Sequence, residues 1–363
     1  MKINTKLISL AFNVIKKDAL ANLGILFRSC FNAPYAITLS ITDRCNARCI
    51  TCNRWQFDTA SQELSIETWK NLLSDLAKFT THCQVAFTGG EPFMKEGFLE
   101  LLKSSEKMHI YNKVITNGAV FKKGEYEEIL KAGVDFILFS LNSIGPEIHN
   151  RYKGVEGLHQ TITEAIKYIK SKNRKIKIGV LFIITKDNFK ELDAFASWIY
   201  SIGVDSIDFQ PIRDNFWPSF KKEFPISAST TNPLWQIADL NELDRQIDLL
   251  LEKKKRGFPI EPTIQELKEI KVFFRNPGAI SHTHHCTIGF RNLIILPNGD
   301  VQLCQYFPVI GNISKDNLKK IWFSNEARLQ RLEMLKCEKP CLAACVRQYS
   351  FYDKVRSFLI RLR

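Results

Sequence analysis

The chain has 363 residues and a formal net charge of +13, with 45% apolar and 25% charged residues. This length suffices for two or three domains with a sizeable core, and the composition excludes a disordered protein. No uninterrupted apolar run approaches ~20 residues, which excludes a membrane-spanning helix. The ten cysteines fall mostly in two clusters of a large chain, which indicates metal binding in a reducing compartment. We therefore expect a cytoplasmic protein.

The two ends of the chain carry basic amphipathic patterns. Residues 1–33 predict a separate helical segment, whose apolar stripe is Ile3, Leu7, Leu10 and Val14. Asn13, Lys16 and Lys17 break any continuous apolar run and no small-residue cleavage site follows, so we expect no signal peptide. The tail 349–363 repeats the pattern with Phe351, Val355, Phe358 and Leu362. Two interpretations stay open: peripheral contact with an anionic membrane, or packing against the protein body.

Strand and helix patterns alternate from residue 34 to residue 215. The expected strands are 36–41, 85–88, 113–115, 136–139, 176–184 and 204–210. The expected helices are 65–79, 95–107, 122–132, 157–172 and 188–201. Polar or glycine residues follow successive strands at the same end, which is where a β/α barrel builds its site. The pattern predicts an α/β fold with a partial (β/α)6 TIM-like barrel.

The loop after the first strand carries three cysteines, Cys45, Cys49 and Cys52, in a C-x3-C-x2-C spacing. Three thiolates from one loop can bind three irons of a [4Fe–4S] cluster and leave the fourth iron open to another ligand. A structural zinc ion is the alternative, but it requires four ligands and usually a distant second cysteine pair. The spacing therefore favours an open cluster in an enzyme.

The second strand runs into Gly89-Gly90-Glu91-Pro92, and with the cysteine spacing this chain resembles the radical SAM superfamily over roughly residues 36–215. The resemblance implies a SAM-binding [4Fe–4S] cluster on the three cysteines. It also implies S-adenosylmethionine (SAM), cleaved to a 5′-deoxyadenosyl radical that abstracts hydrogen from a substrate. At the end of the fourth strand many relatives have Ser-Leu-Asp-Gly, where this chain has Ser140-Leu141-Asn142-Ser143. The implied SAM contacts are Gly89, Gly90, Glu91, Pro92, Thr116, Asn117, Ser140 and Asn142.

Residues 216–280 predict a linker with two helices, about 239–256 and 263–275. The irregular stretch 213–235 is rich in aromatic residues and proline. A loop of this length is often a lid or a binding loop, but an aromatic-anchored crossover without a ligand role fits equally well.

The segment 281–348 predicts a small cysteine-rich α+β domain. Cys304 closes a hairpin around Asn298-Gly299, and the order of elements resembles the SPASM or shorter twitch extension of radical SAM enzymes. Five cysteines are too few for two auxiliary clusters, so the resemblance implies one auxiliary [4Fe–4S] cluster, with Cys286 and Cys304 among its ligands. The spacing leaves open which of the remaining cysteines complete the cluster, and these are Cys337, Cys341 and Cys345. A zinc site with His282, His284 or His285 is the alternative.

These features favour a radical SAM oxidoreductase that acts on a small-molecule, sugar or lipid-linked substrate, with the auxiliary cluster accepting an electron. A peptide-modifying SPASM maturase is the alternative. It is disfavoured here because few residues precede the first strand and because Gln305 stands where sulfatase-maturing relatives have an aspartate base. A zinc-binding, membrane-surface adaptor is a third, non-catalytic hypothesis. The positive charge would attract an acidic electron donor of flavodoxin or ferredoxin type, and no motif indicates a nucleic-acid partner. Substrate and oligomeric state stay unknown.

Overall fold

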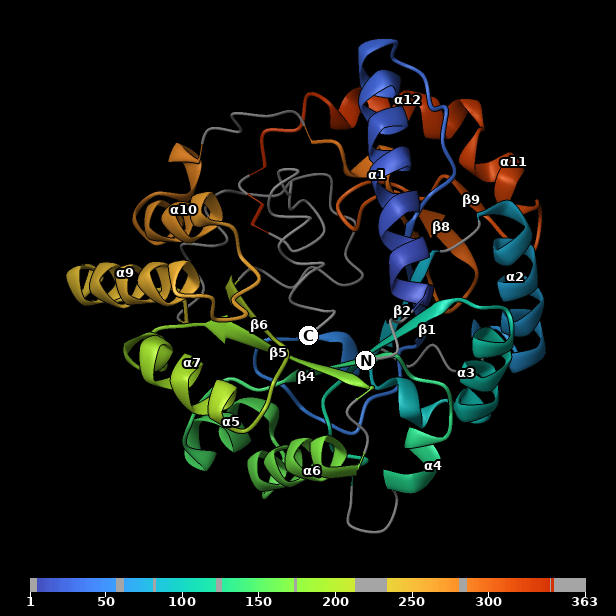
Figure 1. Ribbon diagram of the computed structural model, residues 1–363. Helices are drawn as coiled ribbons and strands as arrows, with labels where there is room; N and C mark the ends of the chain where they lie inside the picture. The colour runs from blue at the N-terminus through green and yellow to red at the C-terminus, as the bar shows by residue number, and fades with distance from the viewer. Residues whose placement is uncertain are drawn as a thin grey trace.

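Six parallel strands form the central layer of the molecule in the computed structural model (Figure 1). It describes residues 5–56, 62–80, 83–121, 126–172, 175–212, 234–280, 286–339 and 341–342, with side chains from residue 15. Most of their residues are buried, although β3 and β6 include polar side chains. Their order follows the chain, so each strand pairs with the next. They are β1 (Ala36–Thr42), β2 (Gln84–Gly89), β3 (Tyr111–Thr116), β4 (Phe136–Ser140), β5 (Lys177–Ile184) and β6 (Ser206–Pro211).

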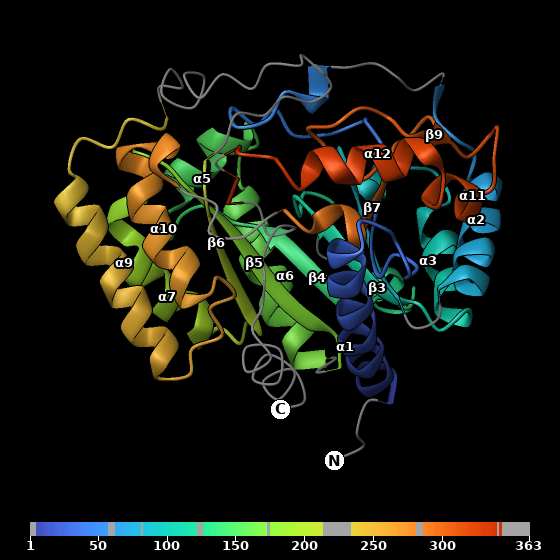
Figure 2. The same ribbon diagram turned by 90° about the horizontal axis from the view of Figure 1, so that it is seen from above.

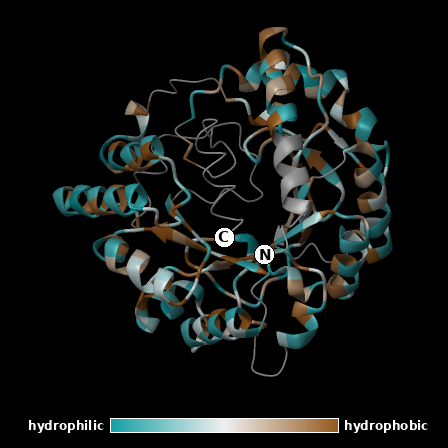
Figure 3. Cartoon of the chain, in the orientation of Figure 1, coloured by the Kyte–Doolittle hydropathy of each residue, from teal (hydrophilic) through white to brown (hydrophobic). Residues whose placement is uncertain are grey.

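Helices cover the outer side of this curved sheet (Figures 1 and 2). In Figure 3 the strands are mostly hydrophobic, whereas the helices carry both colours, as amphipathic helices do. The partial α/β barrel predicted from the sequence is therefore confirmed. The helix α5 was not predicted. The helices are α2 (Ile66–Phe79), α3 (Phe98–Lys107), α4 (Tyr126–Leu130), α5 (Pro146–Lys153), α6 (Leu158–Lys172) and α7 (Leu192–Ser201).

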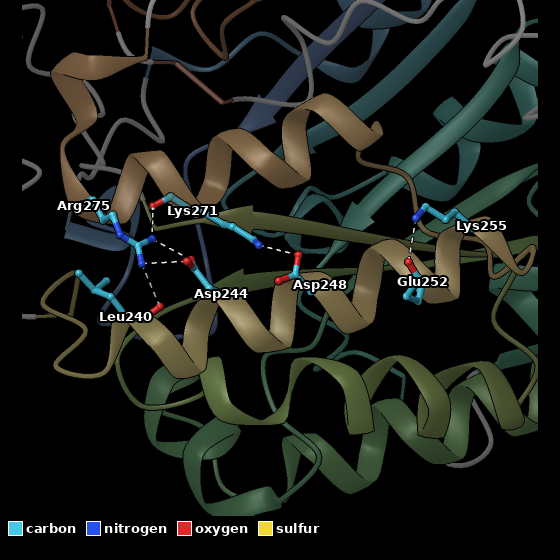
Figure 4. A network of polar contacts seen from close by, with 7 residues as sticks. All are labelled: Leu240, Asp244, Asp248, Glu252, Lys255, Lys271 and Arg275. Carbon is cyan, nitrogen blue, oxygen red and sulfur yellow. Dashed lines mark hydrogen bonds and ion pairs between the residues drawn. The ribbon is translucent and has the colours of Figure 1, made fainter.

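Two further helices, α9 (Leu240–Lys255) and α10 (Ile264–Arg275), continue this outer layer beside α7 and β6. Arg275 Nη1 lies 2.7 Å from Asp244 Oδ1, and Lys271 Nζ lies 2.6 Å from Asp248 Oδ1 (Figure 4). Exposed pairs of this kind contribute about 0–1 kcal/mol each, so the buried apolar faces hold the two helices together. The helices predicted within the linker thus belong to the barrel wall. Residues 213–233, which carry the lid prediction, lie outside the described part.

The C-terminal segment extends the barrel sheet. Strand β7 (Asn292–Ile295) pairs in parallel with β1, with Ala36 opposite Asn292 and Leu39 opposite Ile295. Strands β8 (Asp300–Gln302) and β9 (Gly311–Asn312) follow antiparallel, which gives the order β6-β5-β4-β3-β2-β1-β7-β8-β9. The predicted hairpin turns at Gly299, whose φ of 87° suits glycine. Helices α11 (Leu318–Trp322) and α12 (Asn325–Met334) complete this segment.

The N-terminal helix α1 (Thr5–Leu26) packs against the body through its second half. Lys17 Nζ donates to Thr80 Oγ1 at 2.6 Å, Tyr35 donates to Asp18, and Ala21 is buried. The side chains of the predicted N-terminal stripe and the whole tail 349–363 lie outside the described residues. Among the helices that the structure describes, none combines the length and the apolar character needed to cross a bilayer.

Candidate functional site

The three cysteines of the first motif lie on the loop that leaves the carboxyl end of β1. Cys45, Cys49 and Cys52 are all half-buried, and none is in a disulfide. Asn117 Nδ2 donates to the Cys45 sulfur at 3.6 Å and to Asn46 Oδ1 at 2.8 Å. Burial raises the pKa of Cys45 and Cys49, because a thiolate is poorly stabilised away from water. Positive charge from bound metal would reverse that cost.

The segment Gly89-Gly90-Glu91-Pro92 lies directly against the base of the cysteine loop. Gly90 N donates to Thr42 O, and Glu91 N donates to Arg44 O, both at 2.8 Å. A Cβ atom at Gly90 would lie 2.2 Å from Arg44 O, and Gly89 has a φ of 135°. Both glycines are therefore required by the close approach of two backbone segments. Contact of this segment with SAM, which the resemblance implies, stays a prediction.

Glu91 is fully buried beneath the loop. Its carboxylate accepts hydrogen bonds from Thr116 Oγ1 at 2.9 and 3.0 Å and from Asn117 N at 2.8 Å. Burial raises the pKa of Glu91 to about 7, although these donors oppose the shift. The predicted residues of the second and third strand ends are thus brought together around one carboxyl group.

A second carboxylate, Glu63, joins the cysteine loop to the end of the glycine segment. Glu63 accepts from Thr42 Oγ1 at 2.7 Å and from Asp43 N at 2.9 Å, and Lys95 Nζ lies 2.9 Å away. The side chains of Glu63 and Lys95 are 1% and 9% exposed. The ion pair holds two neighbouring loops together at the carboxyl edge of the sheet.

Helix α5, which the sequence reasoning missed, holds the middle of the cysteine loop. Arg48 N donates to Lys153 O at 2.9 Å and Ile50 N donates to Tyr152 O at 3.0 Å. The Lys153 side chain is buried, and its charge lowers the pKa of both Cys49 and Glu91 against the larger effect of burial. Lys153 is therefore a buried cation between the loop and the glycine segment.

The two predicted residues of the fourth strand end are less central. Ser140 is half-buried at the last position of β4. Asn142 Oδ1 accepts from Ile183 N at 3.1 Å, so this side chain links the ends of β4 and β5. Its Nδ2 atom is buried without a hydrogen-bond partner. Contact of Ser140 and Asn142 with SAM stays a prediction.

The second cysteine group lies in the C-terminal segment. Burial raises the pKa of Cys286 to about 11, and Cys337 and Cys341 raise it further, so these three thiols are electrostatic neighbours. Cys304 is buried after β8, where its sulfur accepts from Tyr306 N at 3.5 Å. Cys345 and the three predicted histidines lie outside the described residues.

The donor sets fit iron–sulfur clusters. Within the described ranges, no three His, Cys, Asp or Glu side chains converge as a single ion would require. A [4Fe–4S] cluster instead distributes its thiolates over separate irons, and soft thiolates are the ligands it takes. Three half-buried thiols on one loop match that requirement better than they match a zinc site, which needs four convergent ligands.

Comparison with protein families gives two matches. The radical SAM superfamily matches residues 39–199, and the SPASM iron–sulfur cluster-binding domain matches residues 286–346. The first range runs from β1 into α7 and includes the cysteine loop, and the second runs from Cys286 past Cys345.

Curated relatives are distant. The PqqA peptide cyclase of Bradyrhizobium diazoefficiens is 23% identical over 237 residues, covering 65% of this chain and 60% of that protein. The antilisterial bacteriocin subtilosin biosynthesis protein AlbA of Bacillus subtilis is 26% identical over 302 residues, covering 81% and 60%. The chain thus spans 60% or less of the length of the first curated relatives it matches. The crystal structure of Streptococcus suis SuiB bound to its precursor peptide SuiA has the same fold, with a TM-score of 0.61 at 15% identity, covering 84% of this chain and 68% of that one.

Proposed function

We propose that this chain cleaves SAM reductively and uses the resulting radical to modify a peptide, because the radical SAM superfamily matches residues 39–199 and the SPASM domain matches residues 286–346. Cys45, Cys49 and Cys52 are the proposed ligands of the SAM-binding [4Fe–4S] cluster. When bound, this cluster supplies the electron that breaks a carbon–sulfur bond of SAM. The observation that carries the proposal is the contact of the cysteine loop with the glycine segment and the buried Glu91 beneath both.

The residues around the loop have separable tasks. The Gly89-Gly90 backbone holds the loop in place, and Glu91 orders Thr116 and Asn117 through three short hydrogen bonds. Lys153 provides a buried positive charge next to Cys49, which suits an anionic group such as the SAM carboxylate.

The peptide substrate rests on the names of the relatives. One is a cyclase of the PqqA peptide, and another is a bacteriocin biosynthesis protein that matches over 81% of this chain. These matches favour the peptide-modifying alternative over the small-molecule substrate that the sequence alone had favoured. Gln305 in place of an aspartate base argues only against the chemistry of sulfatase-maturing relatives.

The proposed auxiliary [4Fe–4S] cluster has Cys286 and Cys304 as ligands, completed from Cys337, Cys341 and Cys345. Cys286, Cys337 and Cys341 are electrostatic neighbours, which supports a shared site. The cluster would take the electron left on the substrate after hydrogen abstraction. We expect roughly eight irons in the intact protein, as two clusters of four.

The test is SAM cleavage by anaerobically reconstituted protein with dithionite as reductant. 5′-Deoxyadenosine should form slowly without substrate, and a variant with Cys45, Cys49 and Cys52 all changed to Ala should form none. That variant should retain about half of the iron. Deoxyadenosine formation by the triple variant would show that the cluster lies elsewhere.

The peptide is tested separately. Short peptides encoded beside the gene are incubated with enzyme, SAM and reductant, and their masses are followed. A peptide that loses hydrogen in step with deoxyadenosine formation supports the proposal. Faster SAM cleavage with a small metabolite and none of the peptides would return the assignment to a small-molecule substrate.

We also propose an acidic, low-potential one-electron carrier as the physiological reductant. Arg48 is exposed on the cysteine loop, where it donates to Cys45 O at 2.9 Å and lies over the Trp55 ring. Ile50 beside it is 53% exposed. A fixed cation next to an apolar side chain, close to the proposed cluster, suits the acidic rim of a small electron carrier.

A further inference from the structure

A buried ion pair closes the neck of the cysteine loop. Asp43 lies two residues before Cys45, and Arg54 lies two residues after Cys52. Arg54 Nη1 donates to Asp43 Oδ1 at 2.8 Å and also donates to Ser40 Oγ on β1. The side chains of Arg54 and Asp43 are only 9% and 10% exposed. A charge pair of this burial is costly to desolvate, which points to a role beyond stability.

Arg54 and Asp43 stand just outside the two ends of the cysteine motif, so their buried ion pair lies where the loop closes. An arginine guanidinium keeps its positive charge at neutral pH, and Asp43 pairs with it there. The position of Arg54 places one buried positive charge beside the first and third cysteines of the loop.

We propose that Arg54 is a positioning residue that raises the reduction potential of the [4Fe–4S] cluster on this loop, and that Asp43 holds it there. The inference rests on the proposed function, because it requires that cluster. Reduction adds one electron from the donor and no proton, so the negative charge on the cluster grows by one. A cation buried nearby stabilises the reduced form more than the oxidised form, since little water screens it.

The two charges predict shifts of opposite sign. Arg54→Gln removes the cation and should make reduction at least tenfold less favourable, a fall of about 59 mV for a one-electron couple. Asp43→Asn keeps a hydrogen-bond acceptor but removes the anion, so the potential should rise. Arg54→Lys keeps the charge and should restore most of the wild-type value. Arg44→Gln is the matched control, because the Arg44 side chain is 45% exposed and water screens its charge.

The measurement is a redox titration of the reconstituted full-length protein, followed by the electron paramagnetic resonance signal that changes when SAM is added. Iron and sulfide are measured first: no cluster in the wild type would refute the proposed function rather than this inference. With a cluster present, an unchanged potential in Arg54→Gln would overturn the inference. Shifts of the same sign in Arg54→Gln and Asp43→Asn, or loss of the cluster in both, would identify the pair as purely structural and would overturn it as well.

Discussion

The backbone amide of Arg48 donates to the carbonyl oxygen of Lys153 at 2.9 Å. This bond ties the cysteine loop after β1 to the last residue of α5, more than 100 positions later in the chain. It places the Lys153 side chain beside the loop, and it leaves the Arg48 side chain at the surface. One backbone hydrogen bond thus fixes both a buried lysine inside the candidate site and an exposed arginine on its surface.

Gly90→Ala should displace the cysteine loop, because the new Cβ would lie 2.2 Å from Arg44 O. We expect a loss of about 1–3 kcal/mol in the free energy of unfolding and loss of SAM cleavage. Gly145→Ala is the control, since φ is −86° and the nearest heavy atom would be 4.0 Å away. At Gly145 an alanine would cap the helix less well but would also make the unfolded chain less flexible. The two effects change the free energy of unfolding in opposite directions, so we expect a small net change. Urea denaturation and a deoxyadenosine assay compare the two, and equal effects would contradict the close-approach argument.

Lys153→Met keeps most of the side-chain volume but removes the buried charge beside Cys49 and Glu91. We expect SAM to bind at least tenfold more weakly, because a charge-assisted contact to its carboxylate is lost. Lys167→Met on the exposed side of α6 should leave binding unchanged. Equilibrium dialysis with SAM measures both. Wild-type affinity in Lys153→Met would assign Lys153 to holding the loop alone.

Glu91 gives a pH dependence whose sign follows from its burial. The folded-state pKa is raised to about 7 from 4.5, so the folded protein binds this proton more tightly than the unfolded chain does. Glu91 therefore costs no stability below about pH 4.5. As the pH rises, the buried carboxylate lowers the free energy of unfolding by a growing amount, which levels off above about pH 7. Glu91→Gln should gain stability relative to wild type over that window.

Urea denaturation of the metal-free proteins between pH 5 and 8 measures this difference. A difference between Glu91→Gln and wild type that stays constant across the range would mean that Glu91 does not titrate there. Glu96, the next glutamate along the chain, is exposed, and Glu96→Gln serves as the matched control.

Arg48→Glu should slow reduction by an acidic flavodoxin about tenfold or more at low salt, because charge reversal opposes the encounter. Reduction by dithionite should not change, since this small reductant does not need the surface. The difference should shrink as salt is added. Stopped-flow absorbance of the cluster follows both reactions. Equal slowing with both reductants would indicate damage to the loop.

Much of the barrel was predictable because buried strands and amphipathic helices show a regular spacing of apolar residues along the sequence. Helix α5 was missed because its eight residues show no clear apolar stripe, with Ile148 and Tyr152 its only large apolar side chains. Its end signals were present: Pro146 stands in the first turn, and Gly154 follows with a φ of 63°. Reading those two residues together would have located it.

The candidate site was predictable only in part. The cysteine spacing and the glycine segment are local patterns, and the structure brings them into contact. Arg54 and Lys153 were not singled out, because a basic residue usually belongs to a solvated surface. The burial of Arg54 depends on its ion pair with Asp43, and that of Lys153 depends on the contact between α5 and the cysteine loop. No spacing rule encodes either contact.

The pairing of β1 with β7 has a consequence for the order in which the protein forms during synthesis. β1 is among the first strands to leave the ribosome, and residues 292–295 follow it only after about 250 further residues. At ordinary elongation rates of ~5–20 residues per second, one edge of β1 waits on the order of ten seconds or longer for its partner. An open edge of apolar residues is prone to pair with other chains. A nascent chain stalled before residue 292 should therefore recruit chaperones more strongly than one released just after it.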